Sequence, residues 1–211
     1  MSRSQHPLLR WVLAVTVAES LGFVVPAVTG VATGGRYWAM VAAGAVEGLL
    51  LGAGQVIGAG PRVLPAVRWI VATGIGAAIA WSIGMLPSVV TLQWTDPPVV
   101  AGVVCAAVIA LVAMPVLQWV ATGFRWGLGA WIPVSAGAWA VGLVWTAVPS
   151  PFVDERTPIS VVVLIYAAAG VLMATTVAVL TGLAVRRLPG FEPPVQLQDR
   201  DEAPEAPRRA A

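Results

Sequence analysis

Six long apolar runs constrain this chain more than any other feature of its sequence. Each is long enough to cross a bilayer core of about 30 Å at a rise of about 1.5 Å per residue. Only 10% of the 211 residues are charged, whereas soluble domains carry about 25%, so we expect lipid around the runs. We predict an all-α membrane protein with transmembrane helices over residues 11–33, 37–60, 66–87, 98–122, 127–149 and 158–185.

The chain divides into three parts by composition. Residues 1–10 are short and basic, residues 11–187 hold the apolar runs, and residues 188–211 have the polar, proline-rich composition of a disordered tail. A signal peptide would also place an apolar run after a basic start. The first run is long, contains Glu19 and lacks a small-x-small cleavage site, so we interpret it as a retained helix.

Arginine placement predicts the orientation. With the N-terminus inside, the outer loops hold only Arg36 and Arg156, and the inner side holds Arg3, Arg10, Arg62, Arg68, Arg125, Arg186 and Arg187. Short cytoplasmic loops are enriched in basic residues, so we predict that both termini are cytoplasmic. The chain has no Lys or Asn and is rich in Ala, Val and Gly, which is typical of a GC-rich bacterial genome. We therefore expect a bacterial inner membrane.

Several tryptophans fall near the predicted helix ends. Indole rings favour the headgroup level because they combine an apolar body with one N–H donor. We predict this position at the inner ends for Trp11, Trp69, Trp119 and Trp126, and at the outer ends for Trp38 and Trp94.

Self-comparison predicts an internal repeat. Residues 55–62 align with residues 118–125 at an offset of 63, and Trp69 aligns with Trp131 at an offset of 62. Adding the first offset to Gln118 reaches Thr181. We expect three parallel helical hairpins of about 60 residues each, related by an axis along the membrane normal.

The repeated segments also carry a resemblance. The motif Gly-x-x-x-Gly-x-Gly-Gln at 48–55 is followed by Arg62 and echoed by Gln118-Trp119 and Thr181-Gly182. It resembles uncharacterised multi-pass bacterial membrane proteins with repeated Gln-Trp…Arg helix ends. The chain departs from that pattern at Val56, where a Trp is expected. Over residues 10–187 the resemblance implies a helical membrane fold and no particular activity.

Glu19 and Glu47 are the strongest candidates for a functional site. By helical rise, Glu19 lies about 13 Å into the bilayer from Arg10. Glu47 lies about 16 Å into the bilayer from Arg36, on the opposite face of the membrane. Both therefore fall near the midplane, where a charge costs a few kcal/mol at least. They either bind a proton or cation as a pair, or act as hydrogen-bonded packing residues. Their positions in the other hairpins are not acidic, which favours one polar pocket over general packing.

Three further polar residues are expected at one depth, namely Gln55, Gln118 and Thr181. Buried amides need partners, so they either converge in one cluster or make independent helix–helix hydrogen bonds.

Small residues recur every four positions in two of the runs. Such stripes allow close helix packing, either within the chain or with a second copy or another membrane protein. They comprise Gly44, Gly48 and Gly52 in one run and Ala72, Gly76, Ala80 and Gly84 in the next.

The sequence contains no nucleophile–base pair, no His/Cys set with metal-ligand spacing and no phosphate-binding loop. It also has no basic stripe outside the helix ends. We therefore expect no catalytic residues, metal, cofactor or nucleic-acid partner. The leading hypothesis is binding or transport of a small solute or cation. The alternatives are a scaffold that packs against another membrane protein and, third, a lipid-modifying enzyme that uses Glu19 or Glu47.

Overall fold

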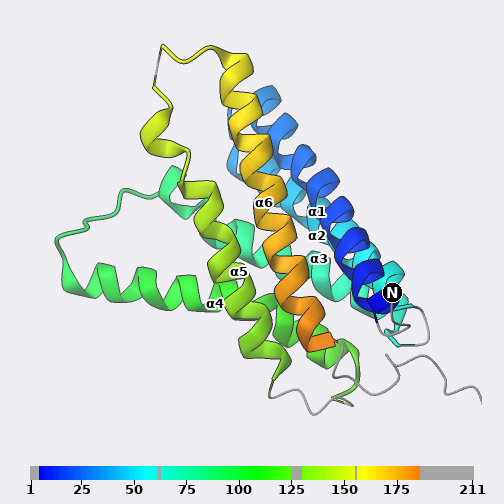
Figure 1. Ribbon diagram of the computed structural model, residues 1–211. Coiled ribbons are helices and arrows are strands. Elements are labelled where there is room, and N and C mark those ends of the chain that lie inside the picture. The colour runs from blue at the N-terminus through cyan, green and yellow to red at the C-terminus, as the bar shows by residue number, and fades with distance from the viewer. Residues whose placement is uncertain (1–4, 61–62, 125–129, 155, 186–211) are drawn as a thin grey trace, which may run out of the picture.

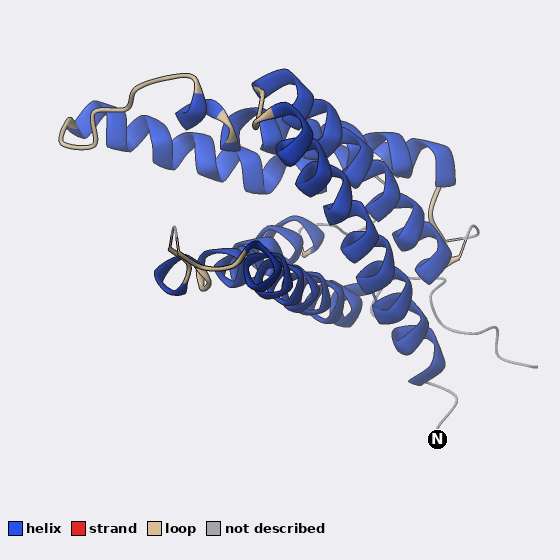
Figure 2. Ribbon diagram, turned by 90° about the horizontal axis from the view of Figure 1, so that it is seen from above, coloured by secondary structure: helices blue, strands red, loops and turns tan. Residues whose placement is uncertain are grey.

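The computed structural model describes residues 5–60, 63–124, 130–154 and 156–185. Helices account for nearly all of this part of the chain, which contains no strand (Figure 2). The elements in chain order are α1 (Gln5–Thr33), α2 (Tyr37–Ala59), α3 (Ala66–Gly84), the 3-10 turn η1 (Leu86–Ser88), α4 (Pro97–Ala121), α5 (Trp131–Ala147), the 3-10 turn η2 (Ser150–Phe152) and α6 (Ile159–Val185). The predicted all-helical fold with six helices is confirmed.

Five of the six helices are long and apolar enough to cross a membrane. The exception is α5, which has 17 residues and spans about 26 Å by helical rise. The sequence prediction extended this helix to 149, but α5 ends at Ala147. Val148 still has helical dihedral angles, but Pro149 has no N–H to continue the helical hydrogen bonds, and the chain tightens into η2.

Several sequence predictions lie outside the described residues. They concern Arg3, Arg62, Trp126, the start of the fifth predicted helix at 127, the tail at 188–211 and the arginines Arg125, Arg186 and Arg187. The orientation of the chain therefore stays a prediction.

The helices form a closed cycle of contacts. Each packs against the next along the chain, and α6 returns to α1 (Figure 1). They are not all parallel, because α4 is steeply inclined to α6 (Figure 1). The buried core gathers around Trp11, Trp69 and Trp131, which lie near the starts of α1, α3 and α5. We call this region the indole end of the bundle.

Glycine brings α1 and α2 into backbone contact. A Cβ atom at Gly58 would lie 2.9 Å from the Cα of Trp11, and one at Gly54 would lie 2.8 Å from the carbonyl oxygen of Ala14. The two helices are thus in close contact near the indole end. This contact sets the position of Glu19 on α1 relative to Glu47 on α2.

Candidate functional site at Glu19 and Glu47

Glu19 points into the bundle from α1. The buried residues of this helix recur at spacings of three and four, which places them on one face. They are Trp11, Val15, Glu19, Gly22 and Pro26. Glu19 is 1% exposed, and neither of its carboxyl oxygens has a hydrogen-bond partner in the described part of the chain. A buried polar group without a partner costs about 1–3 kcal/mol, so this arrangement needs an explanation.

Two hydroxyl groups beside Glu19 share this property. Thr16 and Ser20 lie three residues before and one residue after Glu19, and their hydroxyl oxygens are buried without partners. Among the described residues, five buried side-chain polar atoms lack a partner, and four of them belong to Thr16, Glu19 and Ser20. The unsatisfied oxygens are therefore concentrated on one stretch of α1.

Hydroxyl groups elsewhere in the helices behave differently. In an α-helix, Ser and Thr commonly donate to the carbonyl four residues earlier. Five hydroxyls do so at 2.6–2.8 Å, namely those of Thr33, Thr73, Ser82, Thr175 and Thr181. Thr16 and Ser20 depart from this pattern, so their hydroxyls remain available to another group.

Glu47 has a defined partner. It is 7% exposed, and its Oε2 accepts a 2.7 Å hydrogen bond from the indole Nε1 of Trp81 on α3. A Cβ at Gly44 would overlap that indole ring, so glycine at this position makes room for Trp81. On the α1 side, a Cβ at Gly22 would lie 3.3 Å from the Cγ of Glu47. Glu47 therefore packs about one turn along α1 from Glu19, and no hydrogen bond joins the two carboxyl groups.

Gln55 and Gln118 lie together in a buried network at the indole end. The Nε2 of Gln118 donates to the Oε1 of Gln55 at 3.0 Å and to the Oγ1 of Thr73 at 3.0 Å. Indole N–H groups complete the network: Trp69 donates to Gln55 at 2.7 Å and Trp131 donates to the Oε1 of Gln118 at 3.1 Å. The amide donors of Gln118 and the indole donors of Trp69 and Trp131 are thus used within this network.

Thr181 belongs to a separate contact. Its Oγ1 accepts a 3.2 Å hydrogen bond from the Nε1 of Trp11, which joins the last helix to the first. The structure thus joins Gln55 to Gln118, whereas Thr181 pairs with an indole across the α1–α6 contact.

The indole partners were missed by sequence reasoning. Trp11 and Trp69 were predicted at the headgroup level at the inner helix ends; both are 0% exposed, so their indole rings face the interior of the bundle, and their depth in a membrane stays a prediction. Trp38 and Trp94, at 74% and 61% exposed, do lie on the surface. The spacing in the sequence could have indicated these indole–glutamine pairs, since a Trp follows each of the two aligned glutamines by 13 or 14 residues.

The small-residue stripe of α2 packs inside the chain. A Cβ at Gly48 would lie 2.8 Å from the carbonyl oxygen of Thr73, and one at Gly52 would lie 2.9 Å from the Cα of Ile70. The α2 stripe therefore serves the contact with α3.

The stripe of α3 is used only in part. A Cβ at Gly76 would overlap Met114 of α4, so this glycine serves the contact between the two helices. Ala72 is buried and Ala80 is half-buried, but Gly84 is exposed, with nothing within 4 Å of a Cβ built there. The close packing on α3 ends before Gly84.

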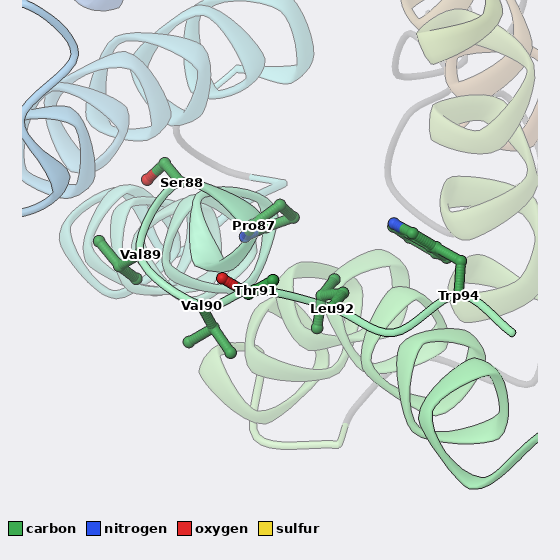
Figure 3. A pocket seen from close by; sticks show the side chains of 7 residues that line it. All are labelled: Pro87, Ser88, Val89, Val90, Thr91, Leu92 and Trp94. Atoms are coloured by element: carbon green, nitrogen blue, oxygen red, sulfur yellow. The ribbon is translucent and has the colours of Figure 1, made fainter. Parts of the chain in front are cut away.

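A hollow of about 410 Å³ lies elsewhere, on the connection between α3 and α4 (Figure 3). Its lining residues are Pro87, Ser88, Val89, Val90, Thr91, Leu92 and Trp94. None of these residues is charged, and none belongs to the predicted site. In the described segments, no three His, Cys, Asp or Glu side chains are grouped to hold a metal ion.

Comparison with known protein families, curated proteins and solved structures finds no match to this chain. The function is therefore inferred from the geometry of the site.

Proposed function

We propose that this chain is a multi-pass membrane protein that binds and moves a proton or small cation through a site at Glu19 and Glu47. The observation that carries the proposal is the buried carboxyl group of Glu19, whose two oxygens have no partner in the described residues. In hydrocarbon such a group is costly, and it is typical of a proton or ion pathway. The neighbouring hydroxyls of Thr16 and Ser20 add neutral oxygen ligands.

The proposal includes six membrane crossings with both termini on the cytoplasmic side of a bacterial inner membrane. The length of α4 supports its crossing despite its inclination, because 25 residues span about 38 Å and a helix longer than the bilayer core tilts. For α5, local thinning of the bilayer offsets the shorter length at a cost of a fraction of a kcal/mol per Å. No catalytic role is included.

The proposal also includes three hairpins, α1–α2, α3–α4 and α5–α6, related by pseudo-threefold symmetry. Three equivalent hydrogen bonds support it: Trp69 donates to α2, Trp131 to α4 and Trp11 to α6. In each case an indole on the first helix of one hairpin donates to the second helix of the preceding hairpin. The hairpins are taken as a ring, so α5–α6 precedes α1–α2. Glu19 and Glu47 break this symmetry, as a single binding site would.

The test is ion flux in proteoliposomes that contain the full chain. Glu19→Gln removes the charge but keeps the shape, and we expect it to abolish proton- or cation-driven flux. Glu47→Gln should reduce flux, because an amide replaces the carboxylate that accepts the hydrogen bond from Trp81. Thr175→Val, on an exposed turn of α6, is the control and should leave flux unchanged. Unchanged flux in both glutamine variants would remove the proposal.

A scaffold is the alternative function, and α4 is the feature that supports it. This helix has a mean hydropathy of 2.7, and only 11% of its apolar span is buried within the chain. A partner helix would find a free apolar surface there. The glycine stripe of α2 is used within the chain and adds nothing to this surface.

A further inference from the structure

We propose that the ligand of this site is a dehydrated sodium ion, held by the carboxylate of Glu19 and the hydroxyl oxygens of Thr16 and Ser20. This inference rests on the proposed function and assigns its substrate class. It starts from the four buried oxygens of these residues, which have no partner in the described chain.

The three residues are placed to act on one ligand. They occupy positions i, i+3 and i+4 of α1, which lie on one face of a helix. The two hydroxyls are free for this role because they do not bond back to their own helix, as the hydroxyls of Thr33 and Thr181 do. The result is a set of oxygen ligands with one negative charge, which suits a hard cation.

A bound proton explains the arrangement less well. A protonated carboxyl donates one O–H and would draw a neighbouring hydroxyl within hydrogen-bond distance. No such bond is formed, because all four oxygens are without partners. One bound cation would give a partner to all four oxygens, whereas a single proton would not.

The ligand set contains one carboxylate. In the described residues both oxygens of Glu19 are without partners, whereas Glu47 accepts the N–H of Trp81 at 2.7 Å and stays outside the set. One carboxylate with two neutral hydroxyls matches the charge of a monovalent ion, and the nearby Glu47 adds to the negative potential that attracts a cation.

The surroundings of the site are apolar and small. The register of α1 on α6 follows from two contacts: a Cβ at Gly170 would meet Phe23, and one at Gly182 would meet Trp11. This antiparallel register places Glu19 opposite Ala174, which is 0% exposed. An ion bound here has shed its water, which Mg²⁺ does reluctantly. Ala174 presents only a methyl group at this position, and a larger side chain there would press on the site.

The experiment measures binding of radioactive sodium to the full chain in lipid nanodiscs. We expect saturable binding that excess Mg²⁺ or Ca²⁺ does not displace. Thr16→Val and Ser20→Ala each remove one oxygen and should weaken binding by roughly ten- to a hundred-fold, as loss of a group that orients or ligates a metal does. Thr175→Val removes an exposed hydroxyl and should bind sodium as the wild type does.

Two further variants sharpen the test. Thr16→Ser retains the oxygen and should preserve sodium affinity, so equal losses in Thr16→Ser and Thr16→Val would overturn the assignment. Ala174→Leu leaves every ligand in place but fills the space opposite Glu19, and it should abolish binding. Wild-type affinity in Ala174→Leu would also overturn the assignment.

The outcomes separate the two proposals. Absent sodium binding, or displacement by divalent ions at lower concentration, overturns the sodium assignment. If proton flux that depends on Glu19 persists in that case, the proposed function stands. If flux is also absent, both proposals fail.

Discussion

Three buried indole N–H groups specify which helices meet. A buried donor left unsatisfied costs more than one hydrogen bond contributes. Trp11, Trp69 and Trp131 satisfy theirs on three different helices, with Thr181, Gln55 and Gln118 as acceptors. The polar pairs therefore select one arrangement of helices that apolar packing alone would leave less defined.

Gln118 makes hydrogen bonds to Gln55, Thr73 and Trp131, so its replacement tests this buried network. Gln118→Leu leaves the N–H of Trp131 and the oxygen of Gln55 without this partner, and we expect it to lower the free energy of unfolding by about 1–3 kcal/mol. Trp131→Phe removes a single hydrogen bond and should cost about 1 kcal/mol. Unfolding in mixed detergent measures both. Equal stability of Gln118→Leu and the wild type would show that the network contributes nothing.

The turn before α6 contains a carboxylate with a shifted pKa. The hydroxyl of Thr157 donates to the Oδ1 of Asp154 at 2.9 Å, and the backbone N–H of Arg156 donates to the same oxygen at 3.0 Å. These bonds lower the pKa of Asp154 below its ordinary value of 3.8. Because the pKa is lowered, the stabilising contribution is present above that value and is lost as the pH falls through the lowered pKa.

Thr157→Val tests this assignment. Loss of the side-chain hydrogen bond should move the pKa of Asp154 upward, toward 3.8. Carboxyl-carbon NMR of the chain in detergent micelles follows the titration directly. Ser88→Ala, in another exposed turn, is the control and should leave that titration in place. A titration that is the same in Thr157→Val and the wild type would contradict the assignment.

At the scale of helices, glycine fixes the distance between α2 and α3. Gly48 and Gly52 face the backbone of α3, and Gly44 leaves space for the indole that binds Glu47. Without a hydrophobic effect between helices in lipid, such close contact supplies much of their attraction. The same glycines therefore support both the packing of α2 and the position of one acid.

Two glycines in different surroundings give a matched prediction. A Cβ at Gly48 would press on the backbone of Thr73, so Gly48→Ala should destabilise the chain by about 1–3 kcal/mol. Gly102 of α4 has nothing within 4 Å, so Gly102→Ala should be neutral or stabilise by about 0.5–1 kcal/mol through helix propensity. Thermal unfolding in detergent compares the two, and a larger loss in Gly102→Ala would contradict the packing described here.

The helices could be predicted from the sequence because the charged and turn residues between them interrupt long apolar runs. The ends were less predictable. Pro87 and Pro149 lie beyond α3 and α5, and the backbone leaves the α-helix two to three residues before each of them, at Gly84 and Ala147. Hydropathy alone does not predict these helix ends, since the residues between each helix end and its proline are as apolar as the helices.

The candidate site could be predicted only as a set of residues. Depth along the helices indicated that Glu19 and Glu47 are neighbours, but not that Trp81 partners only one of them. The hydroxyls of Thr16 and Ser20 were not singled out as ligands, because their availability depends on side-chain rotamers. The rotamers of these two side chains depend on how α6 packs against α1. A single sequence does not reveal that packing.

At the scale of the whole molecule, the proposed membrane crossing requires lipid to cover the exposed apolar surface. Cys105, the one cysteine of the chain, lies on this surface about 12 Å along α4 from Pro97. We predict that a charged maleimide on both sides of a proteoliposome leaves Cys105 unmodified, and that it reacts in sodium dodecyl sulfate. Mass spectrometry measures the adduct.

A second position provides the control for this experiment. Ser88 is exposed in η1, and Ser88→Cys in a Cys105→Ala background should react fully under the same conditions. Rapid modification of Cys105 by the charged reagent in intact vesicles would place α4 in water and contradict the proposed membrane crossing.

The contact between α1 and α6 has a consequence for chain connectivity. A Cβ at Gly182 would touch Leu8 and Trp11 at 2.8 Å, so the two ends of the helical region lie within reach of a short peptide linker. A circular permutant could join Val185 to Gln5 through such a linker and begin instead at Ala66, in the order α3, α4, α5, α6, α1, α2. Every helix would keep its neighbours, since one inserted linker replaces one removed loop.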